Sequence, residues 1–249
     1  MRCIHVLNRT PKEIVESTVD FFSWHNKKVE PRVEFSPDWS GQNLGIYALV
    51  PEWTSIRENL KSPYDLTAHL AHSLHTFSIV ITLDEPLAWG FSAFYQSEPI
   101  GSYNWELPSG FLERRRQQIR HFEEERLRQL GVKGLVNIKA RGNQDRENMD
   151  ISDPYLEQRY RLKISNGEMG LDPPDLQPDL ARSLHKLTGM STTAKIKRIL
   201  TTPHINISGA VAEFSHALGL ANWIDECAVD NIGSQMKRGA CFFYRLIEK

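Results

Sequence analysis

Apolar and polar residues alternate along two neighbouring segments near the middle of the chain. The residues that would share one face of these segments are Phe77, Ile79, Ile81 and Leu83 in the first, and Leu87, Trp89, Phe91, Ala93 and Tyr95 in the second. An alternation with a period of two residues is typical of β-strands that bury one face. Turn-forming residues at 84–86 and 97–99 separate the two segments from each other and from a third that ends at Trp105. The pattern predicts an antiparallel meander over 77–105.

A helix is predicted at 64–75, immediately before the meander. At helical spacing its side chains divide into two arcs, with Leu66, Leu70 and Leu74 on one and His69, His72 and His75 on the other. We expect the leucines to pack against the sheet and the histidines to face water or a partner.

The rest of the chain adds helices and further strands. Thr10 followed by Pro11 is typical of a helix start, so a strand at 2–8 and a helix from Pro11 to near Asn26 are predicted. The other predicted elements are strands at 32–36, 44–50, 134–140, 156–165 and 240–247, and helices at 52–60, 111–130, 176–187, 193–200, 208–218 and 222–229. This order indicates the α+β class, with an antiparallel sheet covered by helices and a helix-rich C-terminal half. We predict an α+β domain at 1–108 and a mostly helical region at 109–249, which either stand apart or pack as one domain.

Composition restricts the classes of partner. The 30 Lys and Arg residues nearly balance the 31 Asp and Glu residues, so no overall field favours nucleic acid or an anionic membrane. The three cysteines are odd in number and share no CxxC spacing, which argues against a disulfide framework and a zinc knuckle. No apolar run has the length of a signal sequence or a membrane span. We therefore expect a cytoplasmic protein that binds neither membrane nor nucleic acid.

The series His69-x-x-His72-x-x-His75 is the candidate metal site. Consecutive members lie one helical turn apart, so a neighbouring pair could share an ion. The outer two lie about 120° apart around the helix, which is poor geometry for three ligands on one ion. A solvated polar face explains the series better, so neither a metal nor another cofactor is predicted.

Asp84 and Glu85 form a second candidate cluster at the tip of the first hairpin. Paired acids can act as general acid and base, or they can dock a basic partner. An aspartate close to a proline is also ordinary turn chemistry, which explains the pair at least as well. The enzyme signatures GxxxxGK[ST], GxGxxG, HExxH and GxSxG do not occur in the sequence, which lowers the expectation of catalysis.

The meander also carries more aromatic residues than one buried face requires. By alternation, Phe94 points opposite to Trp89 and Phe91, and Tyr103 points opposite to Ile100. We therefore expect Phe94 and Tyr103 on the exposed side of the sheet, where large aromatic side chains favour a protein interface.

Residues 70–76 read LAHSLHT and lead into the acidic turn at 83–85, the aromatic strand at 89–95 and the pair Tyr103-Asn104. This order of motifs resembles a pattern in uncharacterised bacterial proteins of similar length, and 214–223 resembles the same family's ending. The turn departs from that pattern at Pro86, where a second acidic residue is usual. The resemblance implies no activity and brings no catalytic residues with it.

Two functions fit these observations. The first is a non-enzymatic cytoplasmic protein-interaction module, of an immunity-type or regulatory kind, that meets another protein through Phe94, Tyr103, Asp84 and Glu85. The second is an enzyme acting on a small polar substrate, with the two acids and the histidine series as acid–base groups. The enzyme hypothesis requires these groups to share one cavity.

Overall fold

The computed structural model describes residues 2–31, 43–58, 63–84, 87–108, 110, 111, 113, 176–204, 206–220 and 241–248. The chain divides into two compact units, one formed by 1–105 with 173–249 and the other by 106–172. The helices and strands below belong to the first unit, apart from Glu106 at the end of one strand. The elements predicted at 32–36, 134–140, 156–165 and 222–229, and most of the helix predicted at 111–130, lie outside the described residues.

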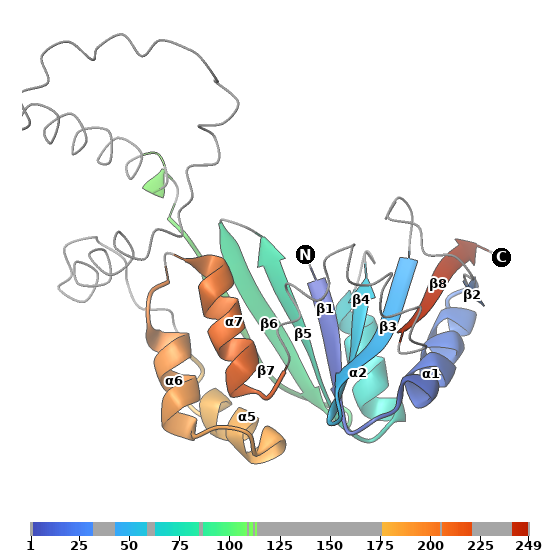
Figure 1. Ribbon diagram of the computed structural model, residues 1–249, viewed down its shortest axis with the longest axis horizontal. Coiled ribbons are helices and arrows are strands. Elements are labelled where there is room, and N and C mark those ends of the chain that lie inside the picture. Colours follow the sequence, from blue (N-terminus) through green and yellow to red (C-terminus); the bar gives the residue numbers. More distant parts are fainter. Residues whose placement is uncertain are drawn as a thin grey trace, which may run out of the picture. The chain divides into compact units, whose positions relative to one another are not determined.

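The described strands form one eight-stranded antiparallel sheet with the order β2-β8-β3-β4-β1-β5-β6-β7 (Figure 1). The strands are β1 (Arg2–Leu7), β2 (Lys27–Pro31), β3 (Asn43–Val50), β4 (Trp53–Glu58), β5 (Phe77–Asp84), β6 (Ala88–Tyr95), β7 (Glu98–Glu106) and β8 (Cys241–Glu248). The meander predicted at 77–105 is β5, β6 and β7. The C-terminal β8 pairs with both β2 and β3, so residues far apart in the sequence complete the sheet.

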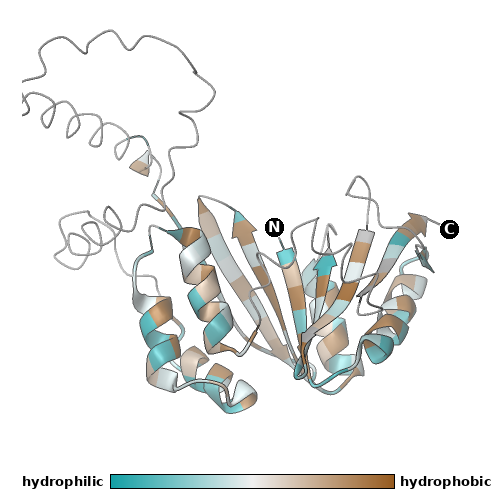
Figure 2. Ribbon diagram, in the orientation of Figure 1, coloured by the Kyte–Doolittle hydropathy of each residue, from teal (hydrophilic) through white to brown (hydrophobic). Residues whose placement is uncertain are grey.

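Helices cover both faces of this sheet. They are α1 (Pro11–Trp24), α2 (Pro63–Ser73), α5 (Leu180–Thr188), α6 (Thr193–Thr201) and α7 (Ile207–Ala217). In Figure 1, α1 and α2 lie against the half of the sheet near β1 and β3, whereas α5, α6 and α7 gather beside β6 and β7. The helices show apolar and polar stripes, while the central strands are mostly apolar (Figure 2). The predicted α+β class is confirmed.

The core between the sheet and helices α1 and α2 follows from alternation along β1. Ile4 and Val6 are fully buried in one cluster with Ile14 of α1 and Leu70 of α2. Leu66 and Val80 belong to the same cluster, as the leucine arc of the predicted helix requires. Burial of this kind contributes about 1.5–3 kcal/mol for each large aliphatic side chain.

The core under α7 is aromatic. The ring of Phe214 stacks on Phe91 with centroids 4.7 Å apart and lies 5.4 Å from Trp89. The ring of Tyr103 lies 4.8 Å from Trp89 and 5.6 Å from Phe91. We call Trp89, Phe91, Tyr103 and Phe214 the aromatic cluster. It joins the meander to a helix more than 100 residues later in the sequence.

The start of α1 confirms the prediction from Thr10 and Pro11. The Glu13 amide donates to the Thr10 hydroxyl oxygen at 3.3 Å, and the Glu13 carboxylate accepts from the Thr10 amide at 2.8 Å. This reciprocal capping satisfies two amides that a helix start would otherwise leave without partners. Hydrogen bonds from the Thr10 backbone and side chain lower the pKa of Glu13.

The helix predicted at 52–60 is wrong, because Trp53–Glu58 is the strand β4. It pairs on one side with β1 and on the other with β3, and its Trp53 and Ile56 are both buried. Residues such as Trp, Thr and Ile favour a strand once neighbouring strands offer two complete ladders. This tertiary context outweighs the weak helical preference of the segment.

None of the described helices has the length and apolar character that crossing a membrane demands.

Candidate functional site

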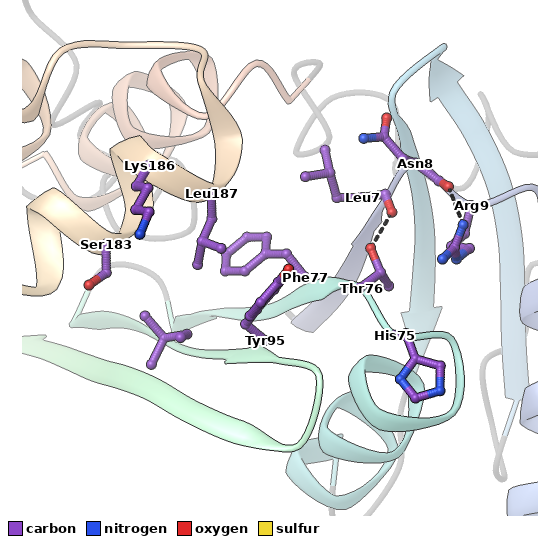
Figure 3. Close-up of a pocket in the computed structure, with 11 residues that line it drawn as sticks. Leu7, Asn8, Arg9, His75, Thr76, Phe77, Tyr95, Ser183, Lys186 and Leu187 are labelled. Atoms are coloured by element: carbon purple, nitrogen blue, oxygen red, sulfur yellow. Dashed lines mark hydrogen bonds between the residues drawn. The ribbon is translucent and has the colours of Figure 1, made fainter.

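A cavity of about 660 Å³ opens at the end of the sheet where β1 finishes and β5 begins (Figure 3). The described residues that line it are Leu7, Asn8, Arg9, His75, Thr76, Phe77, Tyr95, Ile100, Ser183, Lys186 and Leu187. They come from four neighbouring strands, from the connections that follow β1 and precede β5, and from α5. We call this space the sheet-end cavity. Its volume falls within the range of about 300–1,000 Å³ that is typical of ligand sites.

Hydrogen bonds between chain segments hold one wall of the sheet-end cavity. Because β1 and β5 are antiparallel neighbours, the end of the first meets the start of the second. The Thr76 hydroxyl donates to the Leu7 carbonyl oxygen at 2.7 Å. The Gln96 amide donates to the Thr76 carbonyl oxygen at 3.0 Å, which ties the β6–β7 turn to the same place. The wall is therefore formed before any ligand arrives.

Arg9 brings a positive charge to this wall. Its Nε and Nη2 donate to the Leu74 carbonyl oxygen at 3.0 and 2.6 Å, and its Nη1 donates to the Asn8 carbonyl oxygen at 3.2 Å. These acceptors are uncharged, so the bonds orient the guanidinium, and its charge interacts electrostatically with the Glu13 carboxylate, which does not line the cavity. Leu74 directly follows Ser73, the last residue of α2, and cationic groups are favoured at this end of a helix.

A second positive charge stands on the opposite wall. Figure 3 shows Lys186 and Ser183 on α5 across the cavity from Asn8 and Arg9, with the rings of Phe77 and Tyr95 between them. Within the described part of the chain, no carboxylate lies within ion-pair distance of Lys186. The described lining residues include Arg9, His75 and Lys186 and no Asp or Glu. A cavity lined by one sign of charge attracts ligands of the opposite sign.

Asp84 lies away from the sheet-end cavity. It is exposed and lines a smaller cavity of about 250 Å³ with Arg2, Thr82, Leu83, Ala88, Trp89 and Asn104. His75 precedes the first residue of β5 and Asp84 is its last, so roughly 23 Å of extended strand separates the two ends. The structure does not bring Asp84 and His75 together in one cavity. Glu85 lies outside the described residues.

The histidine series does not form one solvated row. His72 and His75 are exposed, as expected for a solvated polar face. Their ring centroids lie 6.3 Å apart. His69 is partly buried instead, because its Nε2 donates to the Ser17 carbonyl oxygen at 3.2 Å and its ring contacts Phe21 of α1. Burial lowers the pKa of His69. Among the described residues, no group of three or more metal-ligating side chains could hold an ion.

The prediction that Tyr103 lies on the exposed side of the meander is wrong. Tyr103 is only 5% exposed and belongs to the aromatic cluster. Burial raises the pKa of its phenol. Phe94 pairs with Ser78, whose hydroxyl donates to the Thr67 carbonyl oxygen of α2, so Phe94 lies on the α2 side of the sheet. It is partly buried there and keeps some exposed surface.

Sequence reasoning missed Arg9 and Lys186. Arg9 follows a short strand and precedes a capped helix, so its sequence neighbours explain the segment without a site. Lys186 is an ordinary polar position on an amphipathic helix. Only the pairing of β1 with β5 and the position of α5 bring the two charges to one cavity, and neither can be inferred from local spacing.

No family model matches the chain, and neither a curated protein nor a solved structure matches it.

Proposed function

We propose that the protein is a non-enzymatic interaction module that binds an acidic segment of another protein in the sheet-end cavity. The observation that carries this proposal is the pair of positive charges, Arg9 and Lys186, on opposite walls of a cavity whose described lining has no acid. An immunity-type or regulatory role in the cytoplasm suits a binder of this kind.

The apolar residues between the charges define the segment further. Phe77 and Tyr95 lie between the Arg9 and Lys186 walls, and Leu187 lies beside Lys186 on α5. Tyr95 is 37% exposed, whereas Phe77 is only 1% exposed. In a partner segment with an apolar or aromatic side chain flanked by acidic residues, that side chain would contact the apolar residues, and the flanking carboxylates would meet Arg9 and Lys186. Aromatic rings and charged groups of this kind dominate the binding energy of protein interfaces.

The test uses a fluorescein-labelled peptide of sequence EDFED and its uncharged amide counterpart QNFQN. We expect EDFED to bind in fluorescence anisotropy, and we expect its affinity to fall steeply as salt is raised. Lys186→Glu should weaken binding about tenfold, which corresponds to about 1.4 kcal/mol.

Lys197→Glu is the matched control. It makes the same charge change at an exposed position on α6, outside the lining of the sheet-end cavity. Equal binding of EDFED and QNFQN, or equal losses in the two variants, would refute the proposal. Displacement of bound EDFED by micromolar amounts of a free dicarboxylate such as succinate would instead point to a small-molecule ligand and overturn the protein-partner assignment.

A further inference from the structure

Backbone strain is concentrated around the sheet-end cavity. Four non-glycine residues in the described part of the chain have positive φ, and three of them are Asn8 at 52°, His75 at 47° and Gln96 at 55°. Asn8 and His75 line the cavity, and Gln96 follows the lining residue Tyr95. Left-handed backbone is uncommon for residues with a side chain, although Asn and His adopt it more readily than most, and its clustering is a feature of functional sites.

His75 occupies the position that ends α2. The His75 amide donates to the His72 carbonyl oxygen at 3.2 Å, and the Thr76 amide donates to the Ala71 carbonyl oxygen at 3.1 Å. These two bonds define a Schellman motif, in which the left-handed residue is usually glycine because a Cβ atom is disfavoured there. The main chain of His75 makes both the turn and its hydrogen bond, so the helix end does not require the imidazole.

Two other described helices, α5 and α7, end with a left-handed glycine, whereas the left-handed residue after α1 is Asn26 at φ 55°. After α7, the Gly219 and Leu220 amides repeat the same two bonds to the His216 and Ser215 carbonyl oxygens at 3.1 and 2.9 Å. After α5, the left-handed residue is Gly189, and a Cβ atom there would meet nothing within 4 Å. The absence of a side chain at Gly189 therefore reflects backbone conformation rather than crowding. His75 is the exception among the ends of α2, α5 and α7.

The imidazole of His75 is available to a ligand. It is exposed, it lines the cavity near Arg9, and its ring nitrogens make no hydrogen bond with any described residue (Figure 3). Its ring contact in the described part of the chain is with His72, at 6.3 Å. A side chain that carries a conformational cost without a structural contact to offset it points to a role in binding.

We propose that His75 is a ligand-binding residue whose imidazole donates a hydrogen bond to a carboxylate on the Arg9 side of the sheet-end cavity. This inference rests on the proposed function, because the ligand is the acidic segment. A hydrogen bond from an N–H group to a charged carboxylate is stronger than a hydrogen bond between two neutral groups. Arg9, fixed by its bonds to carbonyl oxygens, supplies the charge, and His75 supplies a directed donor beside it.

The test compares His75→Gly and His75→Asn with wild-type protein, using the EDFED peptide. Glycine relieves the strained backbone, so the melting temperature should rise by a few degrees. Asparagine tolerates the left-handed conformation, so His75→Asn should fold with a melting temperature near that of the wild type. His75→Gly, which has no side-chain donor, should bind EDFED about tenfold more weakly, and His75→Asn, whose shorter amide keeps a donor, should lose less. The imidazole C–H resonances of His75 should shift when the peptide is added to wild-type protein.

The outcomes separate this inference from the function on which it rests. If both His75 variants bind EDFED as tightly as wild-type protein while Lys186→Glu binds weakly, the role of His75 is refuted and the proposed function stands. If wild-type protein does not bind EDFED, both are refuted. A loss of binding in His75→Gly that accompanies a lower melting temperature, with His75→Asn unaffected, would show a purely structural role and would also refute the inference.

Discussion

Replacing Phe214 by alanine tests whether the C-terminal helices share one core with the meander. Phe214 is fully buried, and its ring contacts Phe91 and Trp89. Truncating a buried phenylalanine costs about 3–5 kcal/mol, since the transfer free energy of the ring is lost and a cavity remains. Stacked aromatic pairs add about 0.5–1.5 kcal/mol to burial alone, which places the expected loss toward the upper half of this range.

Urea unfolding followed by tryptophan fluorescence measures this loss, because Trp89 lies in the same cluster. Leu87→Ala is the control, since Leu87 belongs to the same hairpin but is 45% exposed, and its truncation should cost less than about 1 kcal/mol. The two variants should keep a similar urea slope. If Phe214→Ala loses less than about 1.5 kcal/mol, or if its unfolding splits into two transitions, α7 is not held against the meander as described.

Two further predictions concern buried polar groups. Tyr103→Phe removes a buried hydroxyl that has no hydrogen-bond partner among the described residues. The free energy of unfolding should therefore stay equal or rise by up to about 1 kcal/mol, and EDFED binding should not change. Weaker EDFED binding by a stably folded variant would show that Tyr103 takes part in the interface. Burial lowers the pKa of His5 to about 3, whereas an unfolded histidine titrates near 6.5, so the unfolded chain binds more protons as the pH falls below 6.5. His5 should therefore lower the free energy of unfolding by about 2 kcal/mol between pH 7.5 and pH 5, which urea unfolding at each pH measures. An NMR titration of His5 with a midpoint near 6.5 would contradict this.

Local pattern was sufficient for most elements of the fold. The period-two alternation at 77–95 and the Thr10-Pro11 start each depend on neighbours in sequence, and β5, β6 and α1 lie where they were predicted. The strand at Trp53–Glu58 depends instead on pairing with β1 and β3, which are contributed by other parts of the chain. A short segment with mixed preferences takes the conformation that its neighbours in space provide.

The candidate site was less predictable than the fold. Alternation predicted that Tyr103 points away from Ile100, but it could not show that α7 covers that face. The histidines were grouped by helical spacing, although α1 lies close enough to bury His69 and not His75. In each case the missing information is which helix covers which face of the sheet, and this is set by packing between residues more than 40 positions apart in the sequence.

Three unfavourable features coincide at the sheet-end cavity. Non-glycine residues adopt left-handed backbone there, the like charges of Arg9 and Lys186 line one space, and the open volume forgoes the contacts of close packing. Away from the cavity, one described non-glycine residue, Asn26, has positive φ, while Gly189 takes the left-handed position after α5 and a capping box satisfies the start of α1. An acidic ligand would offset the second and third costs at once, because it neutralises the charges and fills the volume. The binding energy of such a ligand should therefore appear as a higher melting temperature of the complex, with the largest gain at low salt.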